Sequence, residues 1–253
     1  MTNLKVNSSF SQRHPVWAVV IIEGLLLVAM IAAGAYATIK QLSYTAPVLI
    51  AFVPIALVLI AYFTIRHKWS YMGFRPLGSI PAANWIYYAP LLLILVITTL
   101  NGFRKIELSD ALYYLFFTLL VGFVEEGLYR GLILKTLLTK SVKVAVATSS
   151  ILFAVTHILN ALSGQNLTET LLQIVYALLI GIVLALLMVK NNNIIPLILF
   201  HFLHNLIRFV GNDSPEGFIG YDLLIVVVLA AYAIWIALSL KRTPLPSGID
   251  QAG

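Results

Sequence analysis

The sequence predicts an all-α, polytopic membrane protein, a bundle of about eight transmembrane helices in a single domain over residues 1–253. Hydrophobic residues make up 60% and charged residues 10% of the chain, whereas soluble domains average about 45–50% and ~25%. The chain also divides into eight long apolar stretches, and its basic residues gather in alternate loops between them. These observations exclude a soluble globular enzyme.

Each apolar stretch is near the ~20 residues that a helix needs to cross a bilayer, and polar or Gly/Pro residues separate them. In chain order they are Val16–Ile39, Ala46–Ile65, Ala82–Leu100, Ala111–Leu138, Val144–Leu162, Thr170–Val189, Ile194–Val210 and Asp222–Leu240. The alternating strands of a membrane barrel are missing from the sequence. The first stretch is too long for a cleavable signal peptide and is predicted to remain as an anchor helix.

Basic residues favour the cytoplasmic side of a membrane protein. Eleven of the 16 lie at the two ends or in the second, fourth and sixth loops, and four lie in the other loops. We therefore expect an integral, multi-pass protein with both termini in the cytoplasm. The same bias explains the net charge of +6 without a nucleic-acid partner, and the zero cysteines exclude thiolate metal sites and a cysteine nucleophile.

Ionisable groups gather inside three of the predicted helices, although each costs about 2.5–3.5 kcal/mol to insert into a membrane. Residues 111–138 contain Glu125, Glu126 and Arg130, residues 144–162 contain His157, and residues 194–210 contain His201 and Asn205. At ~1.5 Å per residue, these groups lie about 10–20 Å from the cytoplasmic boundary. A shared depth favours one site built by three helices.

The spacing within each helix separates the groups by role. Glu126 and Arg130 are four residues apart and are expected to pair, whereas Glu125 is rotated by ~100° and is expected to point elsewhere. His201 and Asn205 share a face and can address one ligand together. One carboxylate is thus neutralised, and the other is left available for chemistry.

Such a cluster can move a proton from water and stabilise an oxyanion, as amide hydrolysis requires. Glu125 and His157 can activate the water, while His201 and Asn205 donate hydrogen bonds to the tetrahedral oxygen. Alternatively, His157 and His201 hold a zinc ion whose bound water Glu125 deprotonates.

The three motifs together, Glu125-Glu126-x-x-x-Arg130, Phe153-x-x-x-His157 and His201-x-x-x-Asn205, resemble the CAAX-protease and bacteriocin-processing (CPBP or Abi) family. The resemblance covers a core of about residues 111–210 and implies an intramembrane metalloprotease like the Ras-converting enzyme. It implies catalytic roles for Glu125, His157, His201 and Asn205 and structural roles for Glu126 and Arg130. The implied substrate is a membrane-associated peptide or protein, with CAAX peptides, bacteriocin leaders and other membrane peptides all open.

Other classes of function fit the sequence less well or remain as rivals. A non-catalytic membrane scaffold, such as a bacteriocin self-immunity or sensor-regulating protein, can keep the same motifs for structure. A proton-coupled transporter is expected to show paired halves with broken helices, which the sequence lacks. A rhomboid-type Ser163 lacks its glycine pattern, and no His-Glu-x-x-His motif exists. His204 is assigned to an interhelical hydrogen bond, Phe153 and Tyr129 to packing, and Glu23 to no role.

Overall fold

The computed structural model describes residues 9–162, 166–212 and 219–242. Ser163, which was considered as a rhomboid-type nucleophile, lies outside the described residues. Within these ranges every regular element is a helix, and the pairing of Phe103 with Gly211 is an isolated bridge. The predicted all-α class is therefore confirmed. In chain order the elements are α1 (Phe10–Arg13), α2 (Pro15–Ile39), α3 (Ala46–Ile65), η1 (Leu77–Ser79), η2 (Ala82–Tyr88), α4 (Ala89–Thr99), α5 (Leu108–Glu126), η3 (Gly127–Ile133), α6 (Leu134–Leu138), α7 (Val142–Thr156), α8 (Leu159–Leu162), α9 (Leu167–Asn191), α10 (Ile195–Val210) and α11 (Ile219–Arg242).

Among the described residues, 6 helical segments are long and apolar enough to cross a membrane. The other two predicted spans are the shorter apolar helices α7 and α10, of 15 and 16 residues. At 1.5 Å per residue, each of them is about 22–24 Å long, less than the ~30 Å hydrocarbon core. The two short helices also position two of the candidate residues, because His157 directly follows α7 and His201 lies in α10.

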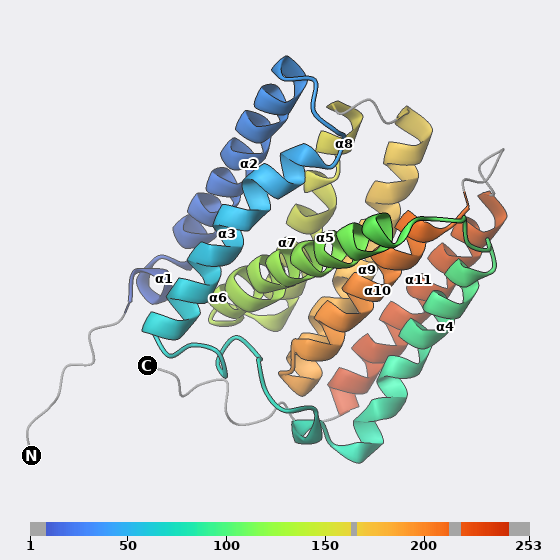
Figure 1. Cartoon of the computed structure of the whole chain (residues 1–253). Helices are drawn as coiled ribbons and strands as arrows, with labels where there is room; N and C mark the ends of the chain where they lie inside the picture. The colour runs from blue at the N-terminus through green and yellow to red at the C-terminus, as the bar shows by residue number, and fades with distance from the viewer. Residues whose placement is uncertain (1–8, 163–165, 213–218, 243–253) are drawn as a thin grey trace, which may run out of the picture.

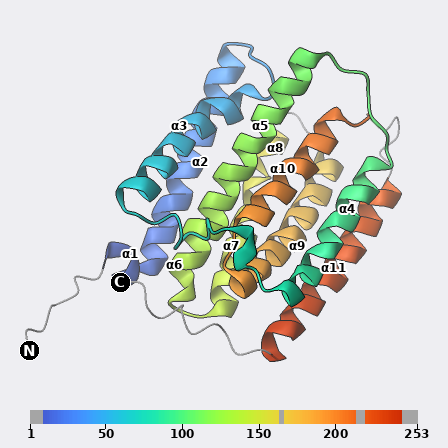
Figure 2. The ribbon, with the colours of Figure 1, turned by 60° about the horizontal axis from the view of Figure 1, so that its bottom comes forward.

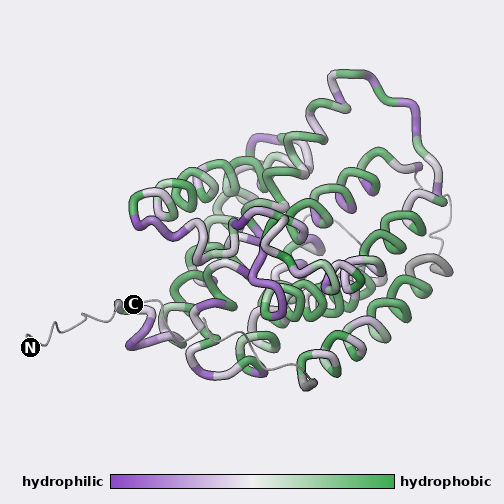
Figure 3. Tube along the Cα trace, turned by 90° about the horizontal axis from the view of Figure 1, so that it is seen from below, coloured by the Kyte–Doolittle hydropathy of each residue, from purple (hydrophilic) through white to green (hydrophobic). Residues whose placement is uncertain are grey.

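The helices form two layers that close into a flattened ring (Figure 1). One layer contains α3, α5, α10 and α4 in that order, and the other contains α2, α7, α9 and α11 (Figure 2). Contacts between α2 and α3 close one edge, and contacts between α4 and α11 close the other. Hydrophobic residues predominate along the helices, and hydrophilic ones gather at several turns (Figure 3).

The fourth predicted span passes from one layer to the other. Its first part, α5, packs against α3 and α10, whereas its last part, α6, packs against α7 and α2. The π-helical segment η3 joins them, and it begins directly after Glu126. Single π turns inside α-helices are frequent at functional sites. This one places Glu125, Glu126 and Arg130 between the two layers.

Two glycines allow the helices around this crossing to approach closely. A Cβ atom on Gly122 of α5 would lie 3.2 Å from the Ile198 carbonyl oxygen of α10. A Cβ atom on Gly181 of α9 would lie 3.2 Å from the Ser150 Cβ of α7. Small residues let membrane helices pack backbone to backbone. Both contacts bring the site-bearing helices α10 and α7 against their neighbours.

The described ends of the chain lie at one end of the bundle, where α2 begins and α11 ends (Figure 1). The end of α3 and the turn between α6 and α7 lie at the same end, and the α2–α3 and α4–α5 loops lie at the opposite end (Figure 1). The first two segments are followed by or contain Arg66, Lys68 and Lys140, and the two loops contain Lys40 and Arg104. An even number of membrane-spanning helices places both ends of the chain on the same side of the membrane, as the distribution of basic residues in the loops predicts. Cytoplasmic orientation of this end stays a prediction.

Candidate active site

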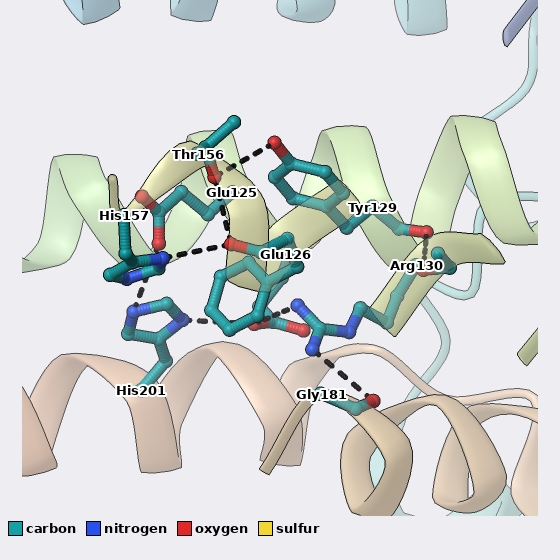
Figure 4. A network of polar contacts seen from close by, with 10 residues as sticks. Glu125, Glu126, Tyr129, Arg130, Thr156, His157, Gly181 and His201 are labelled. Carbon is teal, nitrogen blue, oxygen red and sulfur yellow. Dashed lines mark hydrogen bonds and ion pairs between the residues drawn. The ribbon is translucent and has the colours of Figure 1, made fainter. Parts of the chain in front are cut away.

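A buried ion pair between Glu126 and Arg130 is part of the polar cluster (Figure 4). The side chains of Glu126 and Arg130 are 0% exposed, and Arg130 Nη1 lies 3.0 Å from Glu126 Oε1. The guanidinium also donates from Nη2 to the Gly181 carbonyl oxygen at 3.4 Å and lies over the Phe153 ring at 4.4 Å. The predicted pairing of Glu126 with Arg130 is therefore present, and it ties η3 to α9 and α7.

His201 reaches this cluster from α10 and bridges both carboxylates. Its Nδ1 lies 2.9 Å from Glu126 Oε1, and its Nε2 lies 3.2 Å from Glu125 Oε2. A neutral imidazole has one N–H, so both contacts are hydrogen bonds only when the cluster holds one more proton. With a protonated imidazole, the charges of Glu125, Glu126, Arg130 and His201 sum to zero. The carboxylate that Arg130 leaves unbalanced is thus balanced by His201.

Arg130 pairs with Glu126, and Glu125 instead contacts the other nitrogen of His201. The ~100° between consecutive positions on a helix separates their Cα–Cβ bonds, but glutamate side chains are long and the two imidazole nitrogens point in different directions. One histidine therefore spans both residues. Exposure still distinguishes the carboxylates, because the Glu125 side chain is 16% exposed and the Glu126 side chain is 0% exposed.

His157 approaches from the end of α7, where the helix stops at Thr156. Its Nδ1 lies 2.8 Å from the Phe153 carbonyl oxygen. A carbonyl only accepts hydrogen bonds, so Nδ1 carries the proton, and Nε2 of the neutral ring has the lone pair. Phe153 packs edge-on to His157 and to His201, with ring centroids 5.0 and 6.0 Å apart. Glu125 lies beside the His157 ring (Figure 4).

Asn205 lies one turn beyond His201 on α10, directly after His204. His204 in turn places Nε2 3.0 Å from the Tyr176 hydroxyl of α9, with the two rings stacked. The interhelical hydrogen bond expected of His204 is confirmed. The structure thus brings Glu125, His157 and His201 together, and Asn205 lies at the next turn of α10.

Residues 107–207, from α5 to most of α10, match the family model described as type II CAAX prenyl endopeptidase Rce1-like. This part of the chain is similar to the Rce1-like family. A comparison with curated proteins found no match. All six predicted site residues lie in the Rce1-like region, whereas α2, α3, α4 and α11 lie outside it. At family level, the match and the apolar helices indicate a CAAX-type protease integrated in the membrane by several helices.

The Rce1-like region was also expected to offer a zinc site in one reading of the sequence. Catalytic zinc takes three protein ligands as a rule, and the described residues contain no group of three His, Cys, Asp or Glu placed to hold a metal. Both nitrogens of His201 face carboxylates, and Nδ1 of His157 faces a carbonyl. In this arrangement the side chains do not fit a three-ligand zinc ion.

Sequence reasoning missed several polar contacts of the site. Tyr129, assigned to packing, donates from its hydroxyl to Thr156 Oγ1 at 3.3 Å. Glu23 of α2, assigned no role, is 8% exposed, and its Oε2 atom has no hydrogen-bond partner. The signal that could have singled out Glu23 is its charge, because a carboxyl group inside a membrane helix requires a partner.

Proposed function

We propose that the protein is an intramembrane endopeptidase that hydrolyses a peptide bond of a membrane-associated peptide or protein. The observation that carries this proposal is the meeting of Glu125, His157 and His201 at the layer crossing, with Glu125 as the more exposed carboxylate of the pair. The similarity of residues 107–207 to the Rce1-like family supports it independently.

Glu125 is the general base in this proposal. Its carboxylate takes a proton from a water molecule, and the resulting hydroxide attacks the carbonyl carbon of the peptide bond. His157 assists by accepting a hydrogen bond from the same water at Nε2, the nitrogen that its bond to Phe153 leaves unprotonated. The protonated Glu125 then donates the proton to the leaving amine, so the residues return to their initial state.

His201 stabilises the oxyanion. In the structure its Nε2 faces Glu125 at 3.2 Å, so base and donor neutralise one another before substrate binds. When the peptide carbonyl enters, the Nε2 proton is directed to the carbonyl oxygen, and Glu125 is released to bind water. Nδ1 keeps its contact with Glu126, which orients the imidazole much as a buried carboxylate orients histidine in a serine-protease triad.

Asn205 is the second oxyanion donor proposed from the sequence. It shares a helix face with His201 at one-turn spacing, so its amide can reach the same oxygen. Arg130 contributes indirectly, because it holds Glu126 and the π turn in place. Water is proposed to reach the site from the cytoplasmic side.

A cleavage assay with purified protein in lipid vesicles tests this function. Quenched fluorescent peptides that carry a lipidated CAAX terminus, the same terminus without lipid, and a bacteriocin-type leader distinguish the open substrate classes. We expect one class to be cleaved by the wild type and left intact by Glu125→Gln. Equal cleavage by both proteins would contradict the assignment of the base.

A non-catalytic membrane scaffold is the second candidate. It is favoured by the closed, charge-balanced arrangement of His201 between Glu125 and Glu126, which also suits a purely structural network. In a scaffold, Glu125→Ala leaves the cellular phenotype intact as long as the protein accumulates in the membrane. A protease loses its phenotype with the same variant at the same abundance.

A further inference from the structure

Two lysine side chains lie over one tyrosine ring at the end of the bundle that is predicted to be cytoplasmic. Lys68 Nζ lies 5.1 Å and Lys135 Nζ lies 5.5 Å from the centroid of the Tyr71 ring. The two ammonium nitrogens are therefore no further apart than these two distances added together. Lys135 is 8% exposed and Lys68 is half-buried, so neither charge is fully surrounded by water.

No carboxylate of the surrounding segments balances the two charges. The lysines, the Tyr71 ring and the neighbouring turn between α9 and α10 lie within residues 40–106, 127–168 and 170–212, and none of these ranges contains Asp or Glu. In the described part of the chain, neither lysine forms an ion pair. A charge removed from water is costly unless it is paired. The arrangement therefore favours a negative charge from outside the chain.

The ammonium group of Lys135 has donors left for such a ligand. It donates to Asn192 Oδ1 at 2.5 Å, and Asn192 ends α9 in the left-handed conformation, with φ at 46°. A lysine has three N–H donors. The bond to Asn192 takes one of them and directs the ammonium group to the turn between α9 and α10.

The loop after α3, residues 66–76, is fixed against the same turn. Ile194 donates its backbone N–H to the Gly73 carbonyl oxygen at 2.9 Å. Asn193 donates from Nδ2 to the Arg75 carbonyl oxygen at 3.1 Å. One lysine from this loop and one from α6 are thus held beside a common ring by the backbone around them.

We propose that Lys68 and Lys135, with the Tyr71 ring beside them, bind the phosphate group of an anionic phospholipid in the leaflet at this end of the bundle. The cytoplasmic leaflet carries anionic lipids, and basic pockets between membrane helices on that side bind their head groups. Both lysines have flexible stems, so their ammonium groups can turn to one phosphate. The bound lipid then links α6 to the loop after α3. No step of the proposed protease function enters this inference.

Lipid titration of the purified protein in detergent tests the site. Native mass spectrometry measures Kd for phosphatidylglycerol, which is anionic, and for zwitterionic phosphatidylcholine with the same acyl chains. We expect the wild type to bind phosphatidylglycerol more tightly. Lys68→Gln/Lys135→Gln removes both charges and keeps a donor for Asn192, and it is expected to raise the Kd for phosphatidylglycerol about thirtyfold, the equivalent of about 2 kcal/mol.

The matched control is Lys140→Gln/Lys143→Gln, which removes two exposed positive charges from the same end of the bundle. Its Kd for phosphatidylglycerol is expected to stay within about threefold of the wild-type value. An equal loss in the control would show that the summed surface charge binds the lipid, and it would overturn the site. Equal Kd values of the wild type for the two lipids would overturn it as well.

Two further arms decide between a lipid and a soluble anion, and secure the test against poor folding. Inorganic phosphate and glycerol phosphate are added as competitors, and we expect neither to displace phosphatidylglycerol at equal concentration. Displacement by either would make a soluble phosphate the ligand and overturn the lipid assignment. If the double variant does not accumulate, Lys68→Gln alone carries the test, with an expected increase in Kd of about fivefold; an unchanged Kd would remove Lys68 from the site and overturn the proposal.

Discussion

Removal of the Arg130 guanidinium is the sharpest test of what holds the layer crossing together. Arg130→Ala leaves the Glu126 carboxyl group in a site that is 0% exposed, with Oε2 already without a partner. It also removes the contacts to the Gly181 carbonyl and the Phe153 ring. Three helical elements lose a shared partner in one substitution.

The expected magnitude follows from the burial of both charges. Breaking one side of a buried ion pair costs about 3–5 kcal/mol, because the remaining charge is left uncompensated. His201 still contacts Glu126 and can offset part of this loss. We therefore expect the low end of the range, about 3 kcal/mol, which is a factor of roughly 100 in the folded-to-unfolded ratio.

Membrane abundance and thermal stability in detergent measure this effect. A fluorescent C-terminal fusion reports both, and we expect Arg130→Ala to accumulate several-fold less than the wild type, since unfolded protein is removed in cells. The matched control is Arg130→Met combined with Glu126→Gln, which removes both charges and keeps the volume. Such paired replacements are often close to neutral, so the double variant is expected to be more stable than Arg130→Ala.

The stabilities of Arg130→Ala and of the double variant show whether the ion pair holds the layer crossing together. If Arg130→Ala is as stable as the wild type, the pair does not hold the crossing. If the double variant is the less stable one, packing of the guanidinium, and not the stranded charge, accounts for the loss.

The remaining predictions concern catalysis, packing, metal and topology. Glu125→Gln keeps the shape of the side chain and removes the base, so cleavage is expected to collapse while membrane abundance stays at the wild-type level. Asn205→Ala is expected to lower kcat by about 10²–10³ if the amide is an oxyanion donor, as a cleavage assay measures; an unchanged kcat would remove it from the site. Gly181→Val places methyl groups against Ser150 and is expected to cost about 1–3 kcal/mol in thermal stability. Purified active protein is expected to contain no stoichiometric zinc by elemental analysis and to resist chelators, and a reporter fused after Gly253 is expected to be active only in its cytoplasmic form.

The sequence predicts those features of the fold that depend on local patterns. Apolar length gives the helices, and the i,i+4 rule gives the Glu126–Arg130 pair, with Nη1 and Oε1 3.0 Å apart. The sequence also gives a reason to expect a third partner, because the two negative charges of Glu125 and Glu126 exceed the one positive charge of Arg130. The identity of that partner, His201, depends on how α10 packs against α5, which no local pattern specifies.

The features that the sequence does not predict arise where helices deviate from regular geometry. Span four was expected as one continuous helix, and its π-helical segment directly follows Glu126. The helix expected over residues 144–162 stops at Thr156, so His157 lies at a helix end instead of in a helix interior. Both irregularities follow from tertiary packing around the crossing, and both change which atoms the catalytic candidates can use.

These two irregularities explain how a membrane protein can place so many polar groups together. In a regular helix the Phe153 oxygen would accept the backbone N–H of His157, whereas here that N–H bonds to Ala154 and the Phe153 oxygen accepts from the His157 side chain. Irregular backbone at membrane depth persists only where protein groups satisfy it. The side chains that do so here are Thr156 and His157, which both donate to the Phe153 carbonyl oxygen.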